Sequence, residues 1–190
     1  MKAIIIHGAR GNPDSHWFPW LKEKLEEKGY EVIVPQLPHG EEQTLHGWMN
    51  CFERLDEEID ENTILIGHSL GCPFILHLLE KHKAKAAFFA GGFVSLLNNK
   101  YKEIVRSFVE HFDFEKIQRN CSSFFAYGAD NDHNVPIDKL QELADCLHIK
   151  LQMIPNGGHL QMKTFPKLLK DIKELEDEKK ELRNEKIISF

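Results

Sequence analysis

The chain has 190 residues, of which 42% are hydrophobic and 28% charged, values typical of a globular protein rather than a disordered or fibrous one. With 24 basic against 30 acidic residues the net charge is −6, which argues against nucleic-acid binding, since phosphates are bound by positive surfaces. No apolar run reaches the roughly 18 residues of a membrane-spanning helix, and the apolar N-terminal run is too short for a signal peptide.

Short apolar runs alternate with longer amphipathic segments along the chain. Apolar runs without polar alternation are typical of strands that are buried on both faces of a parallel sheet. They predict strands at residues 4–6, 30–34, 63–66, 84–90, 122–127 and 149–154. Apolar residues spaced three and four apart predict helices at 17–28, 41–60, 101–112, 113–120, 137–147 and about 164–186, with one more helix after Gly71.

This alternation of strands and helices predicts the fold class. We expect a single α/β domain over residues 1–190, with a mostly parallel sheet of about six strands and helices on both faces. In such sheets, ligands bind outside the carboxyl ends of the strands. The side chains that directly follow a strand are therefore the first candidates for function.

The pentapeptide Gly67-His68-Ser69-Leu70-Gly71 directly follows the strand at 63–66. A G-x-S-x-G pattern between an apolar strand and an apolar helix indicates a turn so tight that it needs both glycines. The turn projects the serine hydroxyl above the sheet and puts the N–H of Leu70 at the positive end of a helix, where it can bind an oxyanion. The alternative is a glycine-rich turn with an exposed serine. A phosphate-binding loop is excluded, because G-x-G-x-x-G is absent and no lysine follows the second glycine.

A serine hydroxyl becomes a good nucleophile only when a base takes its proton, and histidine is the usual base. Among 11 histidines, His159 stands out because it follows the strand at 149–154 and two glycines that let its loop bend towards Ser69. The alternative for any single histidine is a solvated side chain. His68 lies inside the pentapeptide, and we expect its side chain to point away from the serine.

An acid must hold the imidazole in the correct tautomer. Asp130 and Asp132 both follow the strand at 122–127. We favour Asp132, because it lies four residues before Pro136, where the next helix can open, and is therefore nearer the histidine loop. Asp130 is the alternative acid, and the aspartate that is not used is expected to form a turn.

The chain order of serine, aspartate and histidine is that of the α/β-hydrolases. Over nearly its whole length, the sequence resembles the small serine hydrolase family that includes the retinoblastoma-binding serine hydrolase and its short bacterial relatives. The resemblance rests on these segments: His7-Gly8, Gly67-His68-Ser69-Leu70-Gly71, Phe114-Glu115-Lys116-Ile117 with Asn120-Cys121, Asp132-x-x-Val135-Pro136 and Gly158-His159. It implies an α/β-hydrolase fold and a catalytic triad of Ser69, His159 and Asp132. Hydrolysis by such a triad needs no metal or organic cofactor, and we expect none.

One motif associated with that family is missing. The Leu-x-Cys-x-Glu motif for binding the retinoblastoma pocket is absent, and the nearest stretch, Met49-Asn50-Cys51-Phe52-Glu53, has methionine in place of leucine. Pocket binding is therefore not inferred.

The resemblance also implies a second oxyanion donor, an N–H near Ala9 in the segment after the first strand; an ordinary glycine turn is the alternative. The candidate substrate contacts are His7, Gly8, Trp17 and Phe93. The aromatic segment 16–20 either lines the pocket or packs on the core at a helix start. Residues 91–101 lie where hydrolases insert a cap. Because this segment is short, we expect a minimal cap with an apolar wall formed by Phe93, Val94 and Leu96.

The expected reaction is hydrolysis of a small carboxylic ester, or of an amide or thioester, through an acyl-serine intermediate. The alternative is a non-catalytic or weakly catalytic protein-interaction module on a hydrolase fold. Between residues 167 and 186, 14 of 20 residues are charged, which is typical of a solvated amphipathic helix packed on the sheet or of a partner-binding extension.

These patterns also give expectations about partners and location. We expect a small-molecule ester or acyl substrate, no nucleic acid, no membrane, and a monomer or weak homodimer. The four cysteines contain no C-x-x-C pair and are expected to be reduced thiols in a cytoplasm.

Overall fold

The computed structural model describes residues 1–55 and 58–188, and the side chains of residues 1–55 and 58–177. Its centre is a six-stranded sheet in the order β2-β1-β3-β4-β5-β6, in which every pair of neighbours is parallel. The strands are β1 (Lys2–Ile6), β2 (Glu31–Ile33), β3 (Thr63–His68), β4 (Ala86–Ala90), β5 (Phe124–Gly128) and β6 (Leu151–Met153). The predicted α/β fold with a parallel sheet is therefore confirmed.

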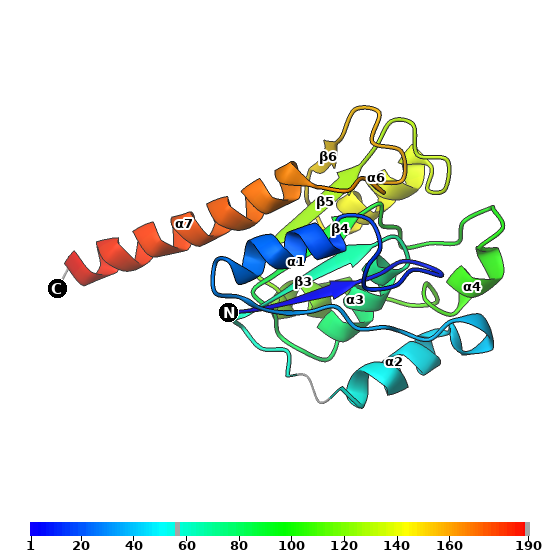
Figure 1. Ribbon diagram of the computed structural model, residues 1–190, viewed down its shortest axis with the longest axis horizontal. Helices are drawn as coiled ribbons and strands as arrows, with labels where there is room; N and C mark the ends of the chain where they lie inside the picture. Colours follow the sequence, from blue (N-terminus) through cyan, green and yellow to red (C-terminus); the bar gives the residue numbers. More distant parts are fainter. Residues whose placement is uncertain (56–57, 189–190) are drawn as a thin grey trace.

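Helices cover both faces of this sheet (Figure 1). They are α1 (Phe18–Glu26), the 3₁₀ helix η1 (Gly40–Glu42), α2 (Leu45–Glu53), α3 (Gly71–Leu79), α4 (Lys102–Arg106), α5 (Phe114–Asn120), α6 (Ile137–Cys146) and α7 (Pro166–Ile188). Buried residues of α1 and α7 form one hydrophobic core, and those of α2 to α6 form a second core on the opposite face.

The strands divide their side chains between these two cores. In β1, Ala3 and Ile5 pack with α1 and α7, whereas Ile4 and Ile6 pack on the α3 face. Successive side chains of a strand point to opposite faces, so a strand that is covered on both faces must be apolar at every position. This requirement explains the continuous apolar runs from which the strands were predicted.

Two predicted helices are shorter than the periodicity indicated. The helix expected at 41–60 is α2, which begins after Thr44, whose Oγ1 accepts a hydrogen bond from the N–H of Gly47 at 3.0 Å. The chain leaves the helix after Glu53, yet Ile59 is buried, so the apolar periodicity continued into a loop. Residues 56 and 57 of the predicted helix lie outside the described part.

The helix expected at 101–112 is reduced to α4. Just beyond its end, the Oγ of Ser107 accepts a hydrogen bond from the N–H of Leu45 at 3.1 Å, which ties the segment to the start of α2. Phe108 is fully buried in a turn rather than in a helix. In this segment, the apolar spacing results from side chains that are buried in turns and does not indicate a helix.

The first turns of α7 pack on the sheet, and the helix then extends past it on the side away from the carboxyl ends of the strands (Figure 1). Its buried Asp171 accepts hydrogen bonds from Tyr127 Oη at 2.6 Å and Gln152 Nε2 at 3.2 Å, and pairs with Lys167. Apolar and polar contacts together fix this helix to the sheet. Among the described helices, α7 included, none combines the length and the apolarity needed to cross a membrane.

Candidate active site

Ser69 occupies a strained turn between β3 and α3. Its φ is +53°, in the left-handed region that L-residues other than glycine rarely adopt. The N–H of Ser69 donates to the carbonyl of Ala90 at 2.9 Å, and the carbonyl of Ser69 accepts from the N–H of Cys72 at 2.9 Å. These bonds fix the backbone on both sides of the strained residue, so the side chain is held at the carboxyl edge of the sheet.

The two glycines of the pentapeptide allow three backbone segments to approach closely. A Cβ at Gly67 would lie 2.9 Å from the carbonyl carbon of Gly71, and a Cβ at Gly71 would lie 2.4 Å from the carbonyl oxygen of Ile6. Both distances are too short for carbon, so any side chain would push the helix off the sheet. The structure therefore contains the tight turn that the pentapeptide predicts, and it gives the steric reason for each glycine.

His159 and Asp132 form a buried pair on the neighbouring loops. Nδ1 of His159 lies 2.8 Å from Oδ2 of Asp132, and the two side chains are only 8% and 1% exposed. The other carboxylate oxygen accepts hydrogen bonds from the N–H groups of Asn134 at 2.8 Å and Val135 at 3.0 Å. Because an ionised carboxylate only accepts, the proton of the neutral imidazole resides on Nδ1 and Nε2 is left as the basic nitrogen.

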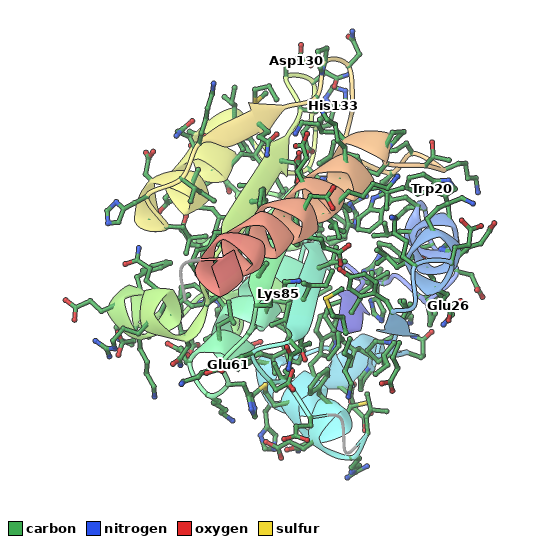
Figure 2. All side chains as sticks on the ribbon, turned by 90° about the vertical axis from the view of Figure 1, so that its left-hand side faces the viewer. Trp20, Glu26, Glu61, Lys85, Asp130 and His133 are labelled. Atoms are coloured by element: carbon green, nitrogen blue, oxygen red, sulfur yellow. The ribbon has the colours of Figure 1, made fainter. Side chains whose placement is uncertain are left out.

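Asp130 has a different partner from Asp132. Its Oδ1 accepts a hydrogen bond from the N–H of Asn156 at 2.9 Å, and Oδ1 of the next residue, Asn131, accepts from the N–H of Gly158 at 2.8 Å. Figure 2 shows Asp130 on the outer loop after β5, together with His133 and away from Glu61 and Lys85. Residues 130–132 therefore hold the histidine loop at three successive points, and Asp132 is the one that touches the imidazole.

The serine, the histidine and the residues of two backbone N–H donors line one cavity of about 50 Å³. Ser69, His159, Ala9 and Leu70 all line it. In the described residues, the N–H groups of Ala9 and Leu70 have no hydrogen-bond partner, and Ser69 and His159 are not hydrogen-bonded to each other. The loop after β1 lies directly against the serine, since a Cβ at Gly8 would be 2.9 Å from Cβ of Ser69.

Two of the candidate substrate contacts do not line this cavity. His7 is buried between loops: Nδ1 lies 2.8 Å from the carbonyl oxygen of Gly8, and Nε2 accepts from the N–H of Leu37 at 3.0 Å. Burial lowers the pKa of His7, which keeps its ring neutral. Trp17 is also buried, and its Nε1–H donates to the carbonyl of Leu160 at 3.0 Å. Both side chains hold the loops in place, whereas the candidates Gly8 and Phe93 do line the cavity.

The apolar wall of the cavity differs in part from the expected one. Phe93 lines it, but Val94 packs into the core and Leu96 is 42% exposed. Further apolar lining residues come from later in the chain, namely Leu97, Tyr101, Val105 and Val135, and from earlier in it, among them Phe18. Segment 91–101 has no regular structure up to the start of α4, so the irregular path of the chain decides which apolar side chains face inward.

His68 lines the cavity together with Ser69, although its side chain was expected to point away from the serine. Its Nε2 lies 2.8 Å from the carbonyl oxygen of His159, and the two rings are 4.9 Å apart between centroids. Burial lowers the pKa of His68 well below its ordinary value, so the ring is neutral and donates Nε2–H to that carbonyl. The residue before the serine therefore supports the histidine loop.

The sequence interpretation did not single out several polar residues that line the cavity. These are Ser15, Asn134 and Gln161; Gln161 lies two residues after the candidate His159. In the aromatic segment 16–20, His16 and Phe18 line the cavity, whereas Trp17 packs in the core. In the described residues, no three His, Cys, Asp or Glu side chains come close enough together to hold a metal ion.

A parallel sheet carrying a strained serine between β3 and α3 defines an α/β-hydrolase fold, and known structures agree. The ydeN gene product of Bacillus subtilis superposes with a TM-score of 0.85 at 26% identity, over 93% of this chain and 98% of that one. Est1E of Butyrivibrio proteoclasticus shares the fold with a TM-score of 0.72 at 19% identity, over 93% of this chain and 88% of that one.

Sequence comparison identifies the family. The model of the serine hydrolase family matches residues 3–172. The ydeN product is 30% identical over 163 residues, which are 83% of this chain and 85% of the relative. The serine hydrolase RBBP9 of Rattus norvegicus is 28% identical over 177 residues, 92% of this chain and 95% of that protein. The chain belongs to the serine hydrolase family.

Proposed function

We propose that this protein hydrolyses small carboxylic esters through an acyl-serine intermediate, with Ser69 as nucleophile, His159 as general base and Asp132 as the acid that orients the histidine. The observation that carries the proposal is that Ser69 and His159 line the same cavity, while Nδ1 of His159 lies 2.8 Å from Oδ2 of the buried Asp132. A solvated histidine would not be buried in this way, and Asp132, besides forming the turn through the N–H groups of Asn134 and Val135, uses its second oxygen to contact the imidazole.

The reaction follows from these positions. Ser69 Oγ attacks the ester carbonyl while Nε2 of His159 takes its proton, and the Asp132 carboxylate stabilises the imidazolium that forms. The N–H groups of Leu70 and Ala9 bind the oxyanion; losing one such donor costs on the order of 3 kcal/mol in the transition state. His159 then protonates the leaving alkoxide as the bond to the acyl carbon breaks. A water molecule, activated by the same histidine, releases the acid and restores the serine.

The cavity supports a small substrate. Its volume of about 50 Å³ is far below the roughly 300–1,000 Å³ of pockets for drug-sized ligands, so only a short acyl group fits inside. Amides and thioesters would use the same steps with a different leaving group. The four cysteines are free thiols, which supports our further proposal that the protein acts in the cytoplasm.

The test is labelling by a fluorophosphonate, which phosphonylates an activated serine. We expect stoichiometric labelling at Ser69 that is lost in Ser69→Ala and in His159→Ala. Ser122→Ala is the control, because Ser122 donates to the carbonyl of Lys85 near the start of β4, at the opposite edge of the sheet. A wild-type protein that is folded, as judged by circular dichroism, and yet unlabelled would contradict the proposal and favour an interaction module on a hydrolase fold.

A further inference from the structure

The cavity has two chemically different sides. On one side lie Phe93, Leu97, Val105 and Val135, all of which belong to the core on the α3 face. On the other side lie Ser15, His16 and Gln161 next to Phe18, which belongs to the core on the α1 and α7 face. A substrate bound at Ser69 therefore meets mainly apolar side chains towards the α3 face, where Asn134 is polar, and Ser15, His16 and Gln161 beside Phe18 towards the other face.

His16 is held on the polar side by a strained backbone. Its φ is +55°, a conformation that costs a non-glycine residue of order 1–3 kcal/mol and persists only where the surroundings enforce it. The ring packs edge-on against His68, with the centroids 5.2 Å apart, and against Phe18 at 5.9 Å. The strained loop therefore fixes an imidazole at the wall of the cavity.

The ring nitrogens of His16 differ from those of the neighbouring histidines. His7, His68 and His159 each have a hydrogen-bond partner within the protein. For His16, no partner is present among the described residues, although the ring lines the cavity. Burial, together with the nearby charges of His159 and Lys163, lowers the pKa of His16. The ring is thus neutral near pH 7, with one N–H donor and one acceptor available to a ligand.

The direction of proton transfer indicates which side of the cavity binds the leaving group and which side binds the acyl group. In the mechanism proposed above, on which this inference rests, His159 gives its proton to the leaving oxygen. The leaving group therefore lies beside His159; His16 lines the same cavity, and both rings contact His68. The acyl group then occupies the opposite, apolar side.

We propose that His16 is a specificity-determining residue that hydrogen-bonds to a hydroxyl of the leaving group, so that the preferred substrates are short-chain acyl esters of polyols. A hydroxyl both donates and accepts, which matches the two nitrogens of a neutral imidazole. An alkyl leaving group would leave these nitrogens without a partner in the closed complex, which lowers its reactivity.

The test compares two esters with the same acyl group, glyceryl monobutyrate and propyl butyrate. We expect the wild-type protein to hydrolyse the glyceryl ester with a kcat/KM about tenfold higher, the value of one neutral hydrogen bond. His16→Phe keeps a ring but removes both nitrogens, and should reduce this ratio to near one. His16→Asn tolerates positive φ and keeps a donor and an acceptor, so it should retain part of the preference.

His148→Phe is the matched control, since His148 is exposed, has the same φ of +55°, and precedes β6 at the opposite edge of the sheet. It should leave the ratio unchanged. Leu97→Ala, on the acyl side, should change kcat/KM for both esters by the same factor.

Fluorophosphonate labelling of every variant separates the two proposals. Without labelling of the wild type, the proposed function fails, and this inference fails with it. A labelled wild type that hydrolyses both esters at the same kcat/KM would overturn this inference alone, whereas a labelled wild type that hydrolyses neither would count against both proposals. An equal loss on both esters in a labelled His16→Phe would also overturn it.

Discussion

The two edges of the sheet differ in the backbone strain they contain. Six non-glycine residues of the described chain have a positive φ. Five of them lie in loops after β1, β3 and β6 at the carboxyl edge: Arg10, His16, Ser69, Asn156 and Leu160. At the amino edge there is His148, where α6 leads into β6. Strain of this kind persists only where the surroundings enforce it, so its distribution marks the carboxyl edge as the functional one without reference to any motif.

The conformations of the loops at the carboxyl edge are fixed mainly by hydrogen bonds from one loop to another. Residues 130–132 bind the loop of His159, His68 binds the carbonyl of His159, and Trp17 binds the carbonyl of Leu160. The body of the molecule is instead stabilised by the two apolar cores on either face of the sheet. Changes at the carboxyl edge should therefore affect activity more than they affect stability, except where backbones touch.

The largest effect should come from the acid. Asp132→Asn keeps the shape but cannot fix the same imidazole tautomer or stabilise the imidazolium, so kcat should fall on the order of 10³–10⁴-fold. Asp130→Asn, two residues earlier, retains an oxygen for the N–H of Asn156 and should lose less than about threefold. Steady-state hydrolysis of an activated butyrate ester measures both. Equal losses in the two variants would show that the buried pair is not the orienting contact.

A smaller but still large effect is expected where α3 meets β1. Gly71→Ala places a Cβ 2.4 Å from the backbone oxygen of Ile6, so the helix or strand must shift, and we expect a loss of about 3 kcal/mol in the free energy of unfolding. At the amino edge, Gly29→Ala has open space around its Cβ and only the strain of φ +82°, which costs about 1 kcal/mol. Urea denaturation measures the two values, and a larger loss for Gly29→Ala would refute the steric explanation.

The smallest effect is the contribution of the buried His68 to pH-dependent stability. Its pKa in the folded protein is lowered by burial, so below the unfolded-state pKa of about 6.5 the unfolded chain binds a proton that the folded one does not. Stability should therefore be highest above that pH and fall as the pH decreases, by up to about 1.4 kcal/mol per pH unit for this group. His7 and His16, whose pKa values are also lowered, add to the same trend.

Urea denaturation between pH 7.5 and 5.5 isolates the contribution of His68. In His68→Gln, the free energy of unfolding should depend less steeply on pH, because up to one proton fewer is taken up on unfolding in this window. His148→Gln, at an exposed position on the amino edge, should match the wild type. If the His68→Gln and wild-type curves are parallel, burial of His68 does not set the acid sensitivity of the fold.

Much of the architecture could be predicted from local patterns. The alternation of apolar runs and amphipathic segments predicted the α/β fold, and the spacing of Gly67 and Gly71 around the serine predicted the tight turn. Periodicity failed for residues 54–55, 58–60 and 107–112. There, Ile59 and Phe108 are buried by loops, and apolar spacing alone does not distinguish a buried loop from a helix.

Sequence by itself determined the elements and the residue types that follow each strand, because these depend on neighbours within a turn or a strand. Only the tertiary structure decided which aspartate meets His159, that His7 and Trp17 hold loops rather than line the cavity, and that His16 faces it. These outcomes depend on contacts between residues that are far apart in the chain, such as Trp17 with Leu160, and therefore on how the loops of separate strands pack at one edge of the sheet.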